Sequence, residues 1–235
     1  MKMSAFALAA LLALAVPTVA ADRDSAVAGS DCAAGGCRAG GTSIDVEGSD
    51  GQSYTIPIPR SPYVMADGSI VIYPGETLIF RFAPTQDGPG APVFVKRMER
   101  AAPTRLLSDS PGAEKYHDPK TGEDYYIARG SDGPIEGGTA RDHLKDQPPG
   151  TVIVSYQQAV GRADMVLTVE HNLGGTLKYD ALIERLSPSG SMGLAPTSTC
   201  PVLPVMIGTE TWPYPIATIT LGRFRFVQAA GFRCE

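Results

Sequence analysis

The sequence predicts an all-β protein, an antiparallel β-sandwich with one long polar loop excursion. Short apolar segments recur along the chain between turns rich in glycine and proline, which number 26 and 20 in 235 residues. Several of these segments alternate apolar and polar residues with a period of two, as half-buried strands do. No segment of useful length has helical periodicity, and ten or so short strands with such turns are typical of a sandwich.

The first 21 residues have the organisation of a secretory signal peptide. Lys2 precedes an apolar run from Ala5 to Val16, and small residues stand at Ala20 and Ala21. A basic start, an apolar centre and a small-residue cleavage site define such a signal. The run is shorter than the roughly 18 apolar residues of a spanning helix, and no other segment approaches that length. We therefore expect an exported protein with no membrane span.

Composition indicates the compartment and limits the partners. Arginine outnumbers lysine and Asn172 is the only asparagine, which suggests a GC-rich bacterial genome and a periplasmic or secreted location. The formal net charge is −5. An acidic protein has no overall electrostatic attraction to nucleic acid or to an anionic membrane surface. We expect neither to be a partner.

The four cysteines predict disulfides. In an oxidising compartment they allow three connectivities. We favour Cys32–Cys37, which is local, and Cys200–Cys234, which flanks one expected strand. The second bridge would stabilise the fold by about 3–4 kcal/mol in the chain-entropy model. The spacing in CAAGGC is not the C-x-x-C of redox and zinc motifs, so a small structural loop is the favoured interpretation.

After the signal peptide the chain divides into two parts. Residues 22–42 are rich in glycine, alanine and aspartate and have little to bury, which predicts a flexible N-terminal segment. Residues 43–235 carry the strand signals and form a single β-sandwich domain. A polar insertion at about 100–150 interrupts this domain, and loops of that length are usually functional or mobile.

The strands expected before the insertion cover three segments. Residues 53–59 are apolar but contain prolines, which fits an edge strand. Residues 68–84 form the clearest unit, with a turn at Pro74-Gly75 between two strands. Residues 91–99 predict a further strand. The alternating residues expected to face the core after the turn are Leu78, Phe80 and Phe82.

The stretch YPGETLIFRF, residues 73–82, resembles strands of the cupredoxin family, whose β-sandwich is immunoglobulin-like in architecture. A blue-copper centre needs two histidines, a cysteine and usually a methionine, with a histidine soon after the cysteine. No histidine follows His171 in this chain. The resemblance therefore implies the architecture without the copper ligands, and we expect no cofactor.

The polar insertion holds one short expected strand, residues 124–128, whose Tyr125 and Tyr126 are candidates for a contact surface. Just before it, residues 117–126 place three acids in a loop that contains glycine. They lack the alternating ladder of a calcium loop, so we favour a solvated turn, with a calcium site as the alternative. These acids are Asp118, Glu123 and Asp124.

Regular patterning returns in residues 151–158, 163–171 and 176–186. The segment HNLGG, residues 171–175, predicts a hairpin turn between the second and third of these strands. One face of the second strand would carry Met165, Leu167 and Val169. One face of the third would carry Leu177, Tyr179, Ala181 and Ile183.

The last strand changes its buried face midway. Ala217, Ile219 and Leu221 share one parity, whereas Phe224 and Phe226 share the other. A strand can change faces only by an extra residue, so we predict a β-bulge at Gly222 or Arg223. The bulge would turn Arg223 and Arg225 outward.

Residues that could carry chemistry are few. His117, His143 and His171 are isolated, and for each a solvent-facing position is the favoured interpretation. Ser191 lacks the glycine that a nucleophile elbow needs two residues earlier, where Ser189 stands. Two alternatives stay open: a carboxylate-based hydrolase, and loose binding of a soft metal ion. The metal alternative would use Met165, His171, Met192 or Met206.

The segment CPVLPVMIGTETWPYP, residues 200–215, has four prolines and the only tryptophan, Trp212. It could be a ligand-binding rim, with Trp212 and Tyr214 exposed. It could instead be a clasp that holds the C-terminus on the core, with Trp212 buried and its indole N–H bonded. Because it leads into an apolar strand flanked by Cys200 and Cys234, we favour the clasp.

The C-terminal arrangement TSTCPVLP…ETWPYPIATITLGRFRF is similar to uncharacterised secreted proteins of Gram-negative bacteria. The similarity covers residues 165–235 and implies export and a β-rich fold, with no catalytic residues. Taken together, we expect an exported, non-enzymatic sandwich that binds a protein or envelope partner. Its contact surface would use the insertion and the proline-rich segment.

Overall fold

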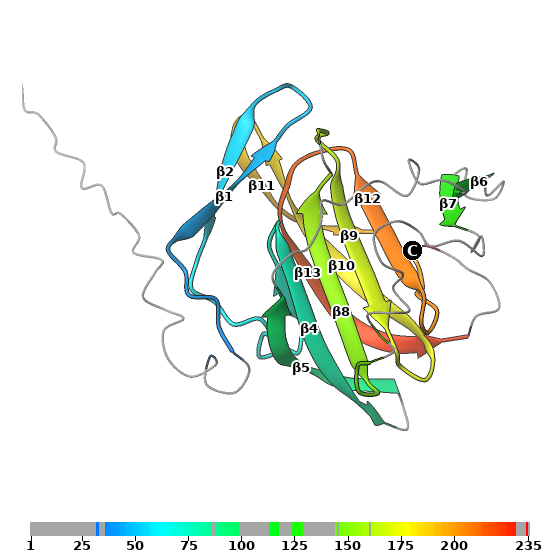
Figure 1. Cartoon of the computed structure of the whole chain (residues 1–235). Helices are drawn as coiled ribbons and strands as arrows, with labels where there is room; N and C mark the ends of the chain where they lie inside the picture. Colours follow the sequence, from blue (N-terminus) through cyan, green and yellow to red (C-terminus); the bar gives the residue numbers. More distant parts are fainter. Residues whose placement is uncertain are drawn as a thin grey trace, which may run out of the picture.

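The structure is a computed structural model of the whole chain (Figure 1). It describes residues 36–85, 88–98, 146–159 and 161–228, together with Cys32, Leu144 and Cys234. Two further strands, Ala113–His117 and Asp124–Ala128, are described by their backbone alone. The expected signal peptide lies outside the described residues, as does most of the insertion at 100–150.

Two antiparallel sheets face each other and form a sandwich (Figure 1). One sheet has four strands, in the order β11 (Gly190–Thr197), β10 (Thr176–Ser187), β13 (Ile216–Val227) and β3 (Ile70–Ile72). The other has five, in the order β12 (Ile207–Trp212), β9 (Met165–His171), β8 (Thr151–Gln158), β4 (Glu76–Thr85) and β5 (Gly88–Met98). This architecture confirms the predicted all-β sandwich. In the described part of the chain, no helix is long and apolar enough to span a membrane.

Two hairpins stand beside the main sheets. β1 (Thr42–Glu47) pairs with β2 (Ser53–Ile58), which includes the predicted edge strand. Their apolar residues share one buried face, whereas the opposite face is exposed. The other hairpin pairs β6 (Ala113–His117) with β7 (Asp124–Ala128). β7 confirms the short strand expected in the insertion, and β6 is a partner that the sequence did not indicate.

Alternating residues of both sheets fill the core, as the period-2 patterns predicted. Ile79 and Ile153 face the other way, onto the outer surface of the five-stranded sheet, where Leu144 packs against them. The far end of the insertion therefore returns across this sheet. The predicted core residues are all buried: Leu78, Phe80, Phe82, Met165, Leu167, Val169, Leu177, Tyr179, Ala181 and Ile183.

Two turns carry the chain from one sheet to the other. The Pro74-Gly75 turn joins β3 of the four-stranded sheet to β4 of the five-stranded sheet. Residues 171–175 likewise join β9 to β10, which lie in different sheets, so the predicted hairpin there is wrong. A period-2 pattern indicates which residues are buried but not which strand lies alongside.

The β-bulge in β13 is confirmed. Lys178 of β10 lies opposite Arg225, but Asp180 lies opposite Gly222, so β13 has one extra residue. Arg223 adopts a left-handed φ of 48° at this position. Beyond the bulge Phe224 packs against Phe82 of the other sheet. Arg223 and Arg225 turn outward and both pair with Asp180, as expected of the outward face.

The N-terminal side of the sandwich is closed by a buried ion pair. Arg38 and Glu76 are 3% and 1% exposed, and the Arg38 Nε and Nη2 atoms donate to the Glu76 carboxylate at 2.8 Å each. Arg38 also donates to the carbonyls of Pro62 and Val71 and lies over the Tyr63 ring. The segment predicted to be flexible, 22–42, is therefore packed from Gly36 onward. The prediction missed that a lone arginine can be buried when every donor finds an acceptor.

Candidate functional site

Both predicted disulfides are present. Cys32 is bonded to Cys37 and Cys200 to Cys234, and no described cysteine is free. Such bridges persist in oxidising compartments and are rare in a reducing cytosol. They indicate an oxidising, extracytoplasmic environment for this protein.

The proline-rich segment is a clasp rather than a rim. Trp212 is 6% exposed, and its Nε1 donates to Thr197 Oγ1 at 3.0 Å, a side-chain acceptor. The Cys200 amide donates to Glu210 Oε1 at 2.6 Å, so residues 197–203 lie beside β12. Trp212 is therefore not part of an exposed contact surface, and its prediction as a candidate binding residue is wrong. We call residues 197–212 the clasp.

His171 ties the clasp to the five-stranded sheet. It is buried, which corrects the solvent-facing position expected for it. Its Nδ1 accepts from the Leu173 amide at 3.2 Å, so Nε2 carries the proton and donates to the Val202 carbonyl at 2.8 Å. Val202 also exchanges backbone hydrogen bonds with Leu177 of the four-stranded sheet. Burial lowers the pKa of His171, which favours the neutral imidazole.

Within the clasp, three exposed apolar residues form a projecting tip: Val205, Met206 and Ile207. Val205 has a left-handed φ of 56°, which is costly for a β-branched residue. Its amide donates to the His171 carbonyl at 2.8 Å, which holds this conformation in place.

The other candidate contact residues are spread over the molecule. Tyr214 is half-buried, and the Arg185 guanidinium stands 3.9 Å above its ring. Tyr125 and Tyr126 lie on β7, opposite Tyr116 and Lys115, but their side chains are outside the described residues. Asp118, Glu123 and the side chain of Asp124 are outside as well.

The residues proposed for metal or nucleophilic chemistry do not assemble into a centre. Met165 lies in the core and both ring nitrogens of His171 are engaged, whereas Met192 is exposed. Over the described ranges, no group of three histidine, cysteine or acidic side chains could hold a metal ion. Ser191 donates to Glu184 at 2.5 Å on the exposed strand β11. His117 and His143 are not described at side-chain level.

The charged side chains contain a group that the sequence analysis missed. Six of the cations with described side chains have partners within the protein. Arg38 pairs with Glu76, Arg162 with Asp164, Arg223 and Arg225 with Asp180, Lys178 with the Thr199 carbonyl, and Arg185 with Tyr214. The remaining four have no ion-pair partner in the described part of the chain. They are Arg60, Arg81, Lys96 and Arg97, which we call the cationic edge.

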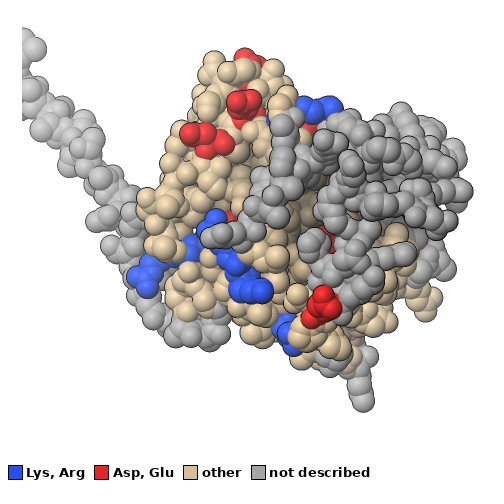
Figure 2. Space-filling model, in the orientation of Figure 1, with Lys and Arg blue, Asp and Glu red and all other residues tan. Residues whose placement is uncertain are grey.

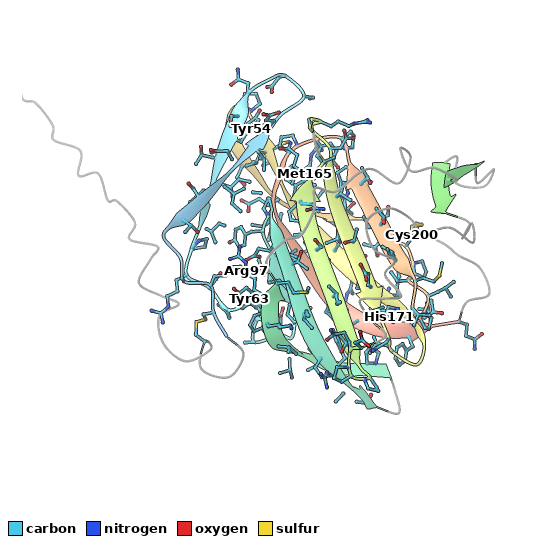
Figure 3. All side chains as sticks on the ribbon, viewed as in Figure 1. Tyr54, Tyr63, Arg97, Met165, His171 and Cys200 are labelled. Atoms are coloured by element: carbon cyan, nitrogen blue, oxygen red, sulfur yellow. A yellow bond between two sulfur atoms is a disulfide. The ribbon has the colours of Figure 1, made fainter. Side chains whose placement is uncertain are left out.

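Three members of the cationic edge, Arg81, Lys96 and Arg97, lie on β4 and on β5, the edge strand of the five-stranded sheet, whereas Arg60 follows β2. Lys96 lies opposite Ile79, on the same outer face of the sheet as Arg81. Arg97 lies opposite the core residue Leu78, and so emerges at the rim of the other face. Figure 2 shows the basic side chains gathered over β4 and β5, while acidic side chains lie on the β1–β2 hairpin above them. Arg97 is labelled beside β5 in Figure 3.

One group of the cationic edge is incompletely satisfied. The Nε of Arg81 is shielded from solvent and has no hydrogen-bond partner among the described residues. A buried donor without an acceptor costs about 1–3 kcal/mol. The Nε of Arg185, outside the cationic edge, is also shielded and without a hydrogen-bond partner in the described part of the chain, so this feature alone does not indicate a ligand.

The sequence held one signal for this site. Lys96 and Arg97 are adjacent in a segment predicted to be a strand, so they must point to opposite faces. Arg81 is distant from them in sequence, and the net charge of −5 hid its association with them.

Comparison of the chain with protein-family models, with curated proteins and with solved structures found no match.

Proposed function

We propose that the protein is an exported, non-enzymatic binding module of the periplasm or the cell exterior. Its contact surface is the cationic edge and its partner is anionic. The observation that carries this proposal is the contrast among the cations. Six cations of the described structure are matched by acceptors or an aromatic ring, whereas Arg60 and the three cations on β4 and β5 have no ion-pair partner there.

Electrostatics favours an anionic partner at this place despite the negative net charge. Like charges near one another repel, and a bound anion relieves that repulsion while it gains attraction to each cation. Attraction between exposed charges extends over about 8–10 Å at physiological salt, so the local charge rather than the net charge governs the contact. In Figure 2 several acidic side chains lie on the β1–β2 hairpin, and another lies beside the lowest of the basic side chains.

Two disulfides support the exported location, and the signal-like residues 1–21 agree with it. The apolar tip of the clasp is a second exposed feature, but it has no charged residues that could make it specific for a partner. Residues 186–209 contain no charged side chain.

Binding of polyglutamate by the disulfide-bonded protein tests the proposal, with polyglutamine as the uncharged probe. We expect binding of polyglutamate alone, weakened by salt. The double variant Lys96→Gln with Arg97→Gln should raise Kd by about tenfold, which corresponds to about 1.4 kcal/mol.

The matched control is Arg223→Gln with Arg225→Gln, which removes the same charge from the outer face of the other sheet. It should change Kd by less than about twofold, because net charge alone acts weakly at a distance. Equal losses in both double variants would contradict the proposed site, and no binding of polyglutamate would contradict the function.

A further inference from the structure

We infer that the partner is an extended acidic segment of a polypeptide, which adds as a strand to the free edge of β5. This inference rests on the proposed function and names the chemistry of its partner.

The edge of β5 is open. Within the described part of the chain, β5 pairs with β4 on one side and with no strand on the other. A strand at such an edge has unpaired N–H and C=O groups that can pair with another chain. Pro89 and Pro92 interrupt the first half of β5, but residues 93–98 contain no proline. Val95 is an extra residue between the pairs Phe80–Phe94 and Ile79–Lys96, so Lys96 to Met98 is the regular segment that can accept a strand.

The charges lie on both faces of this edge, which distinguishes an added strand from a flat anionic surface. Lys96 and Arg81 lie on the outer face of the sheet, whereas Arg97 emerges on the other face. A membrane surface can approach only one of these faces at a time. Side chains of an added strand point alternately to the two faces, about 4.8 Å from β5. Adjacent acids on such a strand would reach Lys96 and Arg97 together.

Exposed apolar residues on the same strand define the rest of the partner. Val93 and Val95 are 55% and 45% exposed, and Val93 lies opposite Arg81 on the outer face. Cross-strand contact with apolar or β-branched residues would cover them. The expected partner segment therefore combines adjacent acids with flanking valine, isoleucine or threonine, and has no proline.

The edge strand of the other sheet is less suited to this pairing. β11 has a register shift opposite residues 184–186, Gly193 has a φ of 78°, and Pro196 lacks an N–H. Bulges and prolines are devices that prevent strand addition, but β5 also has two register shifts against β4 and prolines at 89 and 92, so charge is what distinguishes the two edges. β11 has no charge with which to select a partner.

Two peptides of equal composition test the two-faced geometry. In Thr-Val-Glu-Glu-Val-Thr the acids would point to opposite faces, and in Thr-Glu-Val-Glu-Val-Thr they would share one face. We expect the first to bind the disulfide-bonded protein at least about fivefold more tightly, since only it meets Lys96 and Arg97 together. Equal affinity, or a preference for the second peptide, would overturn the inference.

Backbone N-methylation tests strand addition itself. Two forms of the tighter peptide would be methylated, one at its odd positions and one at its even positions. One form should lose binding because it lacks the N–H groups that face β5, whereas the other should retain it. Hydrogen exchange of the β5 amides in residues 96–98 should slow on binding of the unmethylated peptide.

The outcomes separate the inference from the proposed function. If polyglutamate binds but both methylated forms bind as well as the parent peptide, strand addition is wrong and the anionic site stands. Binding of phosphatidylglycerol vesicles, with no binding of either peptide, would also overturn the inference. If no anion binds and Lys96→Gln with Arg97→Gln promotes aggregation, both fail, and the charges serve to block edge pairing.

Discussion

The two sides of the sandwich are closed by opposite chemistry. On the side of β11 and β12, the clasp has a disulfide, a buried tryptophan and no charged residue from 186 to 209. On the side of β3 and β5, a buried arginine is bonded to a buried glutamate, and unpaired cations surround the open edge. Figure 3 shows His171 and Cys200 on the first side, with Tyr63 and Arg97 on the second.

This difference suggests that the clasp side mainly stabilises the fold, whereas the side of β3 and β5 provides the proposed contact surface. The clasp joins the two sheets by buried hydrogen bonds, from His171 of one sheet and Leu177 of the other to Val202. The side of β3 and β5 holds two kinds of charged group. The buried Arg38–Glu76 pair has all its hydrogen-bond partners, whereas the cationic edge has no ion-pair partner among the described residues. The following variants test the comparison, from the largest expected effect to the smallest.

Glu76→Gln should be the most damaging substitution on the β5 side. It leaves Arg38 buried without its counter-charge, and breaking a buried ion pair in this way costs about 3–5 kcal/mol. Urea denaturation measures the loss. The double variant Arg38→Met with Glu76→Leu should recover much of it, because no unpaired charge remains. Glu184→Gln is the control. The Glu184 carboxylate accepts hydrogen bonds from the Ser191 and Thr218 hydroxyls and lies near the surface, so this substitution should cost less than about 1 kcal/mol.

Removing the clasp disulfide should destabilise more than removing the N-terminal one. In the chain-entropy model, Cys200→Ser with Cys234→Ser costs about 4 kcal/mol, since the sequence separation is 34. Cys32→Ser with Cys37→Ser, at a separation of 5, should cost about 2 kcal/mol. Thermal unfolding of the two double variants compares them. Similar losses would show that the clasp does not depend on its covalent closure.

The clasp side should be sensitive to acid through His171. Burial holds the pKa of His171 below its ordinary value of 6.5, so below about pH 6.5 the unfolded chain binds a proton that the folded chain does not. Stability is therefore fully present above pH 6.5 and falls as the pH decreases, by at most about 1.4 kcal/mol per pH unit. His171→Gln should lose this part of the pH dependence. An unchanged profile in the variant would show that His171 is not the titrating group.

Val205→Asn should stabilise the protein by up to about 1 kcal/mol, because asparagine tolerates the left-handed conformation that strains a β-branched residue. Val93→Asn is the matched control. It changes another exposed valine, in strand β5, where asparagine is unfavourable, so it should destabilise slightly. Two changes of the same sign would refute the interpretation of strain at Val205.

Lys96→Gln with Arg97→Gln should change the free energy of unfolding by no more than about 0.5 kcal/mol, because both side chains are exposed. Measured beside the loss of polyglutamate binding, this small change would separate contact from stability. A large loss of stability would show that the cationic edge has a structural role.

The sequence predicted what depends on local patterns. Period-2 alternation located the strands and their buried faces, and the parity change between Leu221 and Phe224 located the bulge. Cysteine spacing gave both disulfides. Each of these follows from residues close in the chain or from one geometric rule.

What the sequence could not predict depends on neighbours distant in the chain. The turn after His171 resembles a hairpin turn, but it connects two sheets because each flanking strand finds better partners elsewhere. Burial of Arg38 requires Glu76 and the carbonyls of Pro62 and Val71, which no local pattern joins. The cationic edge was hidden for the same reason, since Arg81 lies beside Lys96 and Arg97 only after β4 pairs with β5.

The pairing of β3 with β13 has a consequence for the order in which the protein folds. Ile72 pairs with Ile219, so the four-stranded sheet is completed only when almost the whole chain is available. Contacts between residues so far apart in sequence require the closure of very large loops, and folds dominated by them reach the native state in milliseconds to seconds rather than microseconds. Until β13 docks, β3 and β10 both have open edges, and the clasp that follows β11 has no finished sheet to close. We therefore expect Cys200 and Cys234 to be the last cysteines to pair during oxidative refolding.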